Sequence, residues 1–139
     1  MATRQKPVTL ALLTCEQIKR GADGFIEGLM GLRHGAVADD LPFTLSRLWV
    51  YWEVTGLAAG QHEYRIVVGD ENLEVAATAE WAIEPDGEYE IINKCARLQD
   101  ITFPVYGIYS VRVICDGETV AVRPFAIVPD EDTDDADAN

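Results

Sequence analysis

The alternation of apolar and polar residues along short segments restricts the fold of this chain more than any other feature. In segment 45–55, every even-numbered position from Leu48 to Val54 is apolar, whereas Glu53 occupies an odd-numbered position. A period of two residues is typical of a β-strand with one buried face. Clusters of Gly, Pro, Asp and Asn interrupt the alternation about every ten residues, which is the spacing of turns in an all-β domain. The pattern predicts an all-β fold.

The alternating segments predict about eight strands, which bury their apolar faces as an antiparallel β-sandwich, with a small closed barrel as the alternative. The predicted strands cover 8–15, 25–32, 45–55, 63–68, 73–79, 89–93, 109–115 and 119–128, with a further run at 97–103. Segment 16–20 is expected to be a turn or a short helical piece, and segment 34–42 a loop. Asp116-Gly117 predicts a type I′ hairpin turn, and Pro124 predicts an edge position or a bulge in the last strand.

The charge of the chain is strongly negative and uneven. Its 24 acidic and 11 basic residues give a formal net charge of −13. This balance argues against partners that are nucleic acids or anionic membranes. Segment 130–139 holds six carboxylates and no base, so we expect a disordered acidic tail. The predicted organisation is a flexible N-terminus at 1–7, a β-sandwich domain at 8–129 and this tail at 130–139.

The three cysteines suit a reducing compartment. Cys15, Cys95 and Cys115 are odd in number and widely spaced, so they form neither a disulfide framework nor a CxxC motif. The sequence shows no secretory signal and no apolar segment long enough to cross a bilayer. We therefore expect a cytoplasmic protein with reduced thiols.

An acidic strip is a candidate binding region. Between Ile66 and Asn93 there is no lysine or arginine but there are eight carboxylates. Four of them share parity and are expected on one strand face: Glu84, Asp86, Glu88 and Glu90. This face could be simply solvated, could bind a basic protein, or could hold a divalent cation or acid–base site.

Two aromatic residues form the second candidate binding region. If the even-numbered side of segment 48–54 faces the core, Trp49 and Tyr51 lie on the opposite face. A loop could cover them there, or they could anchor a protein interface, since Trp and Tyr are favoured contact residues. They could also stack on a sugar ring.

The sequence motifs predict no catalytic residue, no metal ligand and no cofactor. His34 and His62 are the only histidines, and no nucleophile or phosphate-binding motif accompanies them. An enzyme would need a concave pocket that brings His34 or His62 within about 3 Å of an acid, Cys15 or Cys95.

The order of strands and turns resembles a family of small uncharacterised bacterial proteins that carry a domain of unknown function. The resemblance lies in Ala11–Cys15, Asp23–Gly28, Leu41–Leu45, Ala59–His62, and the closing motifs Phe103–Tyr109, Asp116–Glu118 and Arg123–Phe125. It covers most of residues 8–128 and implies a β-sandwich without catalytic residues to carry over. The closing Gly-x-Tyr strand and Asp-Gly hairpin are similar to those of Ig-like sandwich domains, so we expect the Ig-like type.

Together these features predict a non-catalytic β-sandwich that acts through protein–protein contacts, with a protein partner or as a homo-oligomer. The predicted contact residues are Trp49, Tyr51, Glu84, Asp86, Glu88 and Glu90. The alternative is a sandwich that binds a small ligand or carbohydrate. A Cys/His or metal-dependent hydrolase is a third hypothesis.

Overall fold

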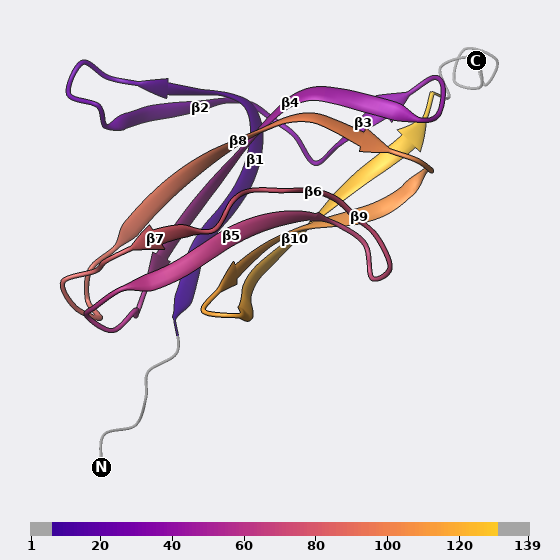
Figure 1. The fold of residues 1–139 in the computed structure, drawn as a ribbon. Helices are drawn as coiled ribbons and strands as arrows, with labels where there is room; N and C mark the ends of the chain where they lie inside the picture. The colour runs from indigo at the N-terminus through magenta and orange to yellow at the C-terminus, as the bar shows by residue number, and fades with distance from the viewer. Residues whose placement is uncertain (1–6, 131–139) are drawn as a thin grey trace.

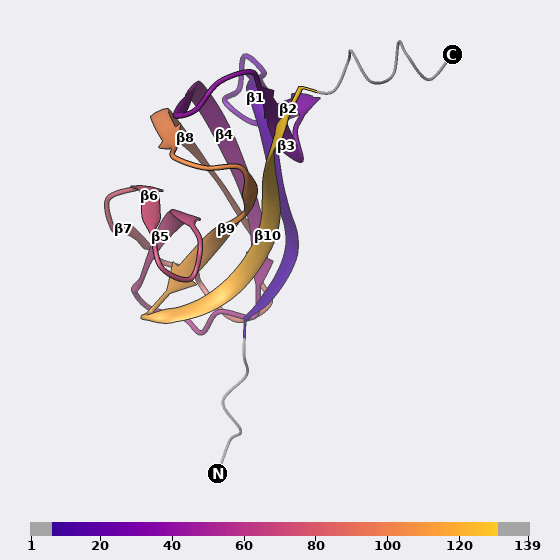
Figure 2. The same cartoon turned by 90° about the vertical axis from the view of Figure 1, so that its right-hand side faces the viewer.

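The computed structural model describes residues 7–130, and within them the chain forms ten β-strands and no helix. The strands make two sheets that pack face to face (Figures 1 and 2). The predicted all-β sandwich is therefore confirmed at this level. Within the same residues, no helix has the length and apolar character needed to cross a bilayer. The predicted flexible N-terminus and acidic tail lie outside the described residues, apart from Pro7 and Asp130.

The first sheet has the order β2-β1-β4-β8, and all its neighbours are antiparallel. Its strands are β1 (Val8–Arg20), β2 (Ile26–Leu32), β4 (Phe43–Thr55) and β8 (Ile92–Phe103). The second sheet has the order β3-β10-β9-β5-β6, and β7 also pairs with β5. Its strands are β3 (Gly35–Ala38), β5 (His62–Gly69), β6 (Glu74–Ala77), β7 (Trp81–Ile83), β9 (Gly107–Cys115) and β10 (Glu118–Pro129).

The alternation in β4 places the core as predicted. The even-numbered residues from Leu48 to Val54 are fully buried, whereas Trp49, Tyr51 and Glu53 are partly exposed on the outer face. An inward-facing row of this kind must pack on the facing sheet, because an antiparallel sheet buries one face. This single row therefore orients the first sheet relative to the second.

Aromatic side chains join the two sheets inside the core. Trp52 of β4 lies 5.3 Å from Tyr64 of β5, measured between ring centroids. Phe103 of β8 lies 5.9 Å from Phe125 of β10 and 4.8 Å from Tyr109 of β9. The Tyr109 hydroxyl also donates a hydrogen bond to the carbonyl oxygen of Val105 at 2.7 Å. These contacts fix the separation of the sheets, since aromatic rings bury the largest apolar areas.

One interruption of the alternation has a backbone cause. Leu98 and Ile101 are three residues apart in β8, yet both are buried, as are their partners Leu48 and Leu45 in β4. Asp100 between them has a φ of 53°, a left-handed conformation that Asp tolerates better than most residues. This change in the backbone places the Ile101 side chain on the core side of β8, the same side as Leu98.

Several predicted element boundaries are wrong. Segment 16–20 continues β1 as a strand because it pairs with β2 in a ribbon that projects beyond β4 (Figure 1). Segment 34–42 contains the short strand β3, which pairs in parallel with the end of β10. At Gly35 a Cβ atom would lie 2.0 Å from the carbonyl oxygen of Ala126, so the pairing requires glycine. Segments 89–93 and 97–103 are not separate strands, because β8 runs continuously from Ile92.

The predicted hairpin turn and the predicted edge position of Pro124 are both confirmed. Asp116 and Gly117 have φ values of 52° and 82°, the positive signs that a type I′ turn requires. Pro124 pairs with Ser110 of β9, while β3 pairs with β10 only from Ala126 onward. At Pro124, β10 is therefore an edge strand, where a missing N–H breaks no ladder bond.

Side chains join the edges of the two sheets between β1 and β10. The Thr9 hydroxyl donates to the carbonyl oxygen of Val120 at 3.2 Å, and the Arg123 guanidinium donates to that of Leu12 at 3.1 Å. The two strands lie in different sheets and share no backbone ladder. The structure is therefore a sandwich closed by side chains at this seam, and the barrel alternative is wrong.

Candidate functional site

Three connecting segments meet at one end of the sandwich, at the bottom of Figure 1: the β4–β5 loop (56–61), the β7–β8 loop (84–91) and the β9–β10 turn. Backbone hydrogen bonds hold them there. The Gly56 amide donates to the carbonyl oxygen of Glu88 at 2.9 Å, and the Asp116 amide to that of Glu63 at 2.8 Å. We call this region the acidic end, after the carboxylates that it gathers: Glu63, Glu80, Glu84, Asp86, Glu88, Glu90 and Asp116.

The four carboxylates predicted on one strand face lie instead in the β7–β8 loop. Strand β7 ends at Ile83, and Pro85 follows, which has no N–H for a sheet ladder. The Glu90 side chain accepts a hydrogen bond from the Asp86 amide at 2.8 Å, so it helps to fold the loop. The loop nevertheless leaves Glu84, Asp86 and Glu90 exposed. The residues stay together, but loop geometry and not strand parity brings them together.

Trp49 and Tyr51 lie on the outer face of the first sheet, as predicted, and both are partly buried. The Arg97 guanidinium lies over the Trp49 ring, 5.8 Å from its centroid. The Tyr51 hydroxyl donates to the Glu53 carboxylate at 2.7 Å. Burial, and then this hydrogen bond and the Glu53 charge, raise the pKa of Tyr51 to about 12. Both rings therefore already have polar partners on this face.

The outer face of β4 leads into the acidic end. Beyond Glu53, the next outward residue is Thr55, whose hydroxyl donates to the carbonyl oxygen of Glu90 at 3.0 Å. The outer face of β4, which carries Trp49 and Tyr51, thus ends at the β7–β8 loop, which carries the exposed carboxylates. The two predicted binding regions are joined in the fold, although 35 residues separate Thr55 from Glu90 in the sequence.

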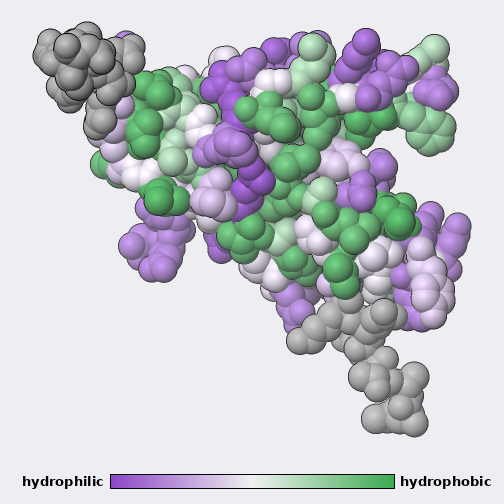
Figure 3. Space-filling model, turned by 180° about the vertical axis from the view of Figure 1, so that it is seen from behind, coloured by the Kyte–Doolittle hydropathy of each residue, from purple (hydrophilic) through white to green (hydrophobic). Residues whose placement is uncertain are grey.

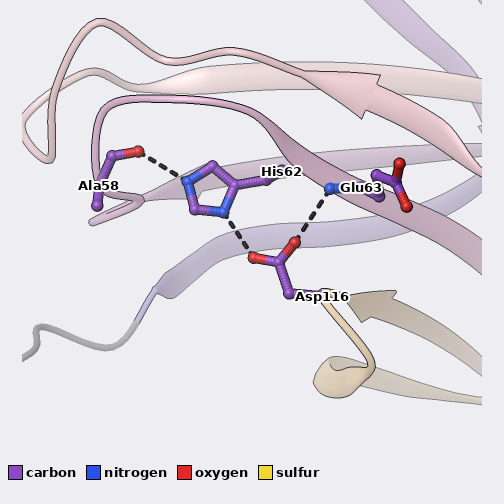
Figure 4. A network of polar contacts seen from close by, with 4 residues as sticks. All are labelled: Ala58, His62, Glu63 and Asp116. Carbon is purple, nitrogen blue, oxygen red and sulfur yellow. Dashed lines mark hydrogen bonds and ion pairs between the residues drawn. The ribbon is translucent and has the colours of Figure 1, made fainter.

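His62 forms the centre of a polar network at the acidic end (Figure 4). Its Nδ1 lies 2.6 Å from the Asp116 carboxylate, and its Nε2 lies 2.7 Å from the carbonyl oxygen of Ala58. The second carboxylate oxygen of Asp116 accepts a hydrogen bond from the Glu63 amide at 3.1 Å. Because a carboxylate and a carbonyl are both acceptors, a proton on each ring nitrogen satisfies both bonds. We call this network the His62 clamp, since it joins the β4–β5 loop to the β9–β10 turn.

A pair of carboxyl groups lies beside the clamp. The hydrogen bond between Glu63 and Glu80, and then the negative charge of Glu80, raise the pKa of Glu63. Two carboxyl groups this close cannot both ionise without repulsion. The acidic end is therefore crowded with negative charge, which favours a cationic group near it.

Cys115 lies under the clamp on the core side. Its thiol is buried, and this burial raises the pKa of the Cys115 thiol to about 11. A ring nitrogen of His62, the Cys115 sulfur and a carboxylate oxygen of Asp116 all lie within 4.8 Å of one another. These are three chemically different donors of the kind that bind metal ions.

The other cysteines and the second histidine lie elsewhere. Cys15 and Cys95 pair in register with Trp49 and Tyr51 on either side of β4, and all three cysteines of the chain are free thiols. The His34 Nδ1 lies 2.6 Å from the Arg123 guanidinium. The distance part of the enzyme hypothesis is thus met by an acid, because the Asp116 carboxylate lies 2.6 Å from His62. Cys15 and Cys95 do not belong to the His62 clamp.

A shallow groove follows the seam between β1 and β10. Thr9–Leu12 and Ala121–Pro124 line it. Two of the lining residues, Leu10 and Val122, are exposed. The face seen in Figure 3 carries a broad band of apolar residues. None of the residues that line this groove belongs to the His62 clamp.

Comparison with known families places this chain. Residues 10–128 match the sequence model of a family of unknown function, DUF6941. The chain belongs to this family. The match spans nearly the whole sandwich, so the resemblance inferred from sequence motifs is confirmed. A comparison with curated proteins found no match.

For this DUF6941 chain, the sequence reasoning missed the His62 clamp and its neighbour Cys115. A signal was present, since His62 opens a strand and Cys115 directly precedes the Asp-Gly hairpin turn. The register of β5 on β9, which pairs Tyr64 with Cys115, is what brings them together.

Proposed function

We propose that this DUF6941 protein is a non-catalytic binding module whose acidic end recognises a basic protein surface. The observation that carries the proposal is the gathering of exposed carboxylates from the β7–β8 loop beside the crowded Glu63 and Glu80 pair. Complementary charge steers association and selects partners. The outer face with Trp49 and Tyr51 adjoins this end and would provide the apolar part of the contact.

A non-catalytic role is supported by the bonding of His62. Both ring nitrogens are held by structural partners, Asp116 and the Ala58 carbonyl. A general base needs one nitrogen directed at the proton that it removes. The His62 clamp instead holds two loops in place.

The charge argues for a different protein rather than a second copy at this surface. A second chain would bring another acidic end, and like charges in contact repel. A small-ligand or carbohydrate module is the alternative. It is less supported at Trp49, because the Arg97 guanidinium already lies over the ring that a sugar would stack on.

We also propose that the sandwich is of the Ig-like type and works in a reducing, cytoplasmic setting. The order β10-β9-β5 in one sheet and β1-β4-β8 in the other matches strands G-F-C and A-B-E of Ig domains. The bond from the Tyr109 hydroxyl to Val105, at the start of β9, is similar to the tyrosine corner of that fold. The three free thiols support the reducing setting.

The test compares two doubly neutralised variants with the natural chain. The first, Glu84→Gln/Asp86→Asn, removes two exposed charges from the acidic end. The matched control, Glu27→Gln/Asp40→Asn, removes two exposed charges elsewhere. Proteins are co-purified from cells with each chain, and the recovered partner is then titrated by calorimetry at low and high salt.

We expect the first variant to bind about 3- to 20-fold more weakly, since each exposed ion pair contributes up to about 1 kcal/mol. The control should bind as the natural chain does, and salt should weaken binding. Equal affinity of all three chains would refute the proposal. A chain that only self-associates, with a mass that drops on Trp49→Ala, would replace the basic partner by a second copy.

A further inference from the structure

Three donor atoms of different chemistry converge where β5 begins and β9 ends. They are a ring nitrogen of His62, a carboxylate oxygen of Asp116 and the sulfur of Cys115, all within 4.8 Å of one another; Nδ1 of His62 lies 2.6 Å from the Asp116 carboxylate. Nitrogen, oxygen and sulfur together form a donor set that Zn²⁺ accepts, whereas Ca²⁺ and Mg²⁺ take oxygen ligands almost alone.

The backbone explains why two consecutive residues face the same point. Neighbouring residues of a strand direct their side chains to opposite faces, and Cys115 faces the core. Asp116 has a φ of 52°, which ends the strand and allows its side chain to return toward His62. The pairing of Tyr64 with Cys115 places His62 two residues away on the same side of the neighbouring strand.

The surrounding bonds orient these groups as metal ligands are oriented. Metal-binding histidines usually donate their second ring N–H to a carboxylate or a backbone carbonyl, and ligating carboxylates are themselves hydrogen-bonded. Here Nε2 of His62 faces the carbonyl oxygen of Ala58 at 2.7 Å, which leaves Nδ1 as the coordinating nitrogen. The Glu63 amide donates to the other oxygen of the Asp116 carboxylate at 3.1 Å.

We propose that Nδ1 of His62, Sγ of Cys115 and the carboxylate of Asp116 bind one Zn²⁺ ion, with water as the fourth ligand. The cation replaces the proton between His62 and Asp116 and the thiol proton of Cys115, so two protons leave as two positive charges enter. The side chain of Asp116 is 41% exposed, which gives the water a route to the ion. The inference is independent of the basic partner proposed above.

The geometry needs only a small adjustment. Zinc bonds of roughly 2.0–2.3 Å in a tetrahedral arrangement place the ligand atoms about 3.3–3.8 Å apart. The present spread is at most 4.8 Å, so the widest separation must close by up to about 1 Å. The contact of 2.6 Å between His62 and Asp116 must open by about 0.7 Å to admit the ion. Asp116 lies in a hairpin turn at the surface, so a shift of about 1 Å can occur there without moving the core.

Co²⁺ is a suitable probe because it takes zinc geometry and absorbs light. The full chain is reduced, freed of metal with a chelator and titrated with Co²⁺. We expect one equivalent to bind, with a thiolate charge-transfer band in the near ultraviolet and intense visible bands of a four-coordinate ion. Added Zn²⁺ should remove both. Zn²⁺ should also raise the unfolding temperature of the natural chain.

Matched variants separate this site from adventitious binding. Cys115→Ser should remove the charge-transfer band, whereas Cys95→Ser should keep it. His62→Asn should weaken binding by about 10-fold or more, whereas His34→Asn should not. Since Cys115 is in the core, Asp116→Asn provides a surface variant that keeps the fold and should still lose affinity.

Two results would overturn the assignment. One is a folded natural chain that gives no charge-transfer band on Co²⁺ addition. A weak visible spectrum without that band, as carboxylate ligands alone produce, counts as the same result. The other is a band that survives Cys115→Ser or that is lost in Cys95→Ser, since the thiol would then lie elsewhere.

Discussion

Replacing Asp116 by asparagine is expected to destabilise the protein, chiefly because the negative charge that interacts with His62 is lost. Asparagine tolerates the left-handed φ of 52° at this position, and its side-chain oxygen can still accept from the Glu63 amide. The change therefore removes the charge opposite His62 while the turn is kept. A double-mutant cycle with His62→Asn isolates this one contact.

The size of the coupling follows from burial and distance. A hydrogen bond to a charged group contributes about 1.5–3 kcal/mol when it is protected from water, and an exposed ion pair about 0.2–1 kcal/mol. The 2.6 Å contact lies between these limits, since the His62 side chain is 12% exposed and that of Asp116 is 41% exposed. We therefore expect a coupling free energy of about 1–2 kcal/mol.

The assay is urea unfolding of the natural chain, both single variants and the double variant, at neutral pH with a chelator present to remove metal ions. Asp70→Asn is the matched control. Asp70 accepts bonds from the Asn72 and Leu73 amides in a comparable turn, so it reports the cost of the amide substitution without a histidine. A coupling below about 0.3 kcal/mol, the usual error of additivity, would refute the clamp.

Three further predictions test the fold. Trp52→Ala should lower the free energy of unfolding by about 3–5 kcal/mol because Trp52 is fully buried, whereas Trp49→Ala on the outer face should cost less than about half of that; equal losses in urea unfolding would contradict the assigned faces. Burial raises the pKa of Cys115 from 9.0 to about 11, so the unfolded thiol ionises first as pH rises. The stability that the protonated Cys115 thiol gives to the folded state is fully present below pH 9, and about 2–3 kcal/mol of it should be lost between pH 9 and 11. The same dependence of stability on pH in Cys115→Ala as in the natural chain would contradict this. Gly117→Ala should destabilise by about 1–2 kcal/mol because its φ is 82°, while Gly87→Ala should be nearly neutral, since a Cβ atom at either glycine meets nothing within 4 Å; similar thermal shifts would show that φ does not matter here.

Local patterns predicted much of the fold because they depend on neighbouring residues alone. The buried row of β4 and the Asp116-Gly117 turn are of this kind. The segment at 84–90 shows the limit of the approach. Its carboxylates alternate like a strand face, but Pro85 and the end of β7 at Ile83 make it a loop. The odd or even position of a residue predicts its strand face only where the segment pairs with a neighbouring strand. The sequence alone does not show which segment that neighbour is.

The candidate site was harder to predict because its members are distant in the sequence. Trp49 and Tyr51 were placed on the outer face by alternation, but the Arg97 guanidinium over Trp49 comes from the neighbouring strand. His62 and Asp116 are separated by 54 residues. Their contact depends on the register between β5 and β9, which long-range packing sets.

The sequence by itself determined that this chain is all-β, which residues of β4 face the core, and where its final hairpin turns. These properties follow from side-chain alternation and from the few residues that accept a positive φ. Only the tertiary structure decided that β3 pairs in parallel with β10, that the β7–β8 carboxylates gather in a loop, and that His62, Cys115 and Asp116 meet. Strand order and register arise from packing between distant segments, and that packing places chemically different side chains at one point.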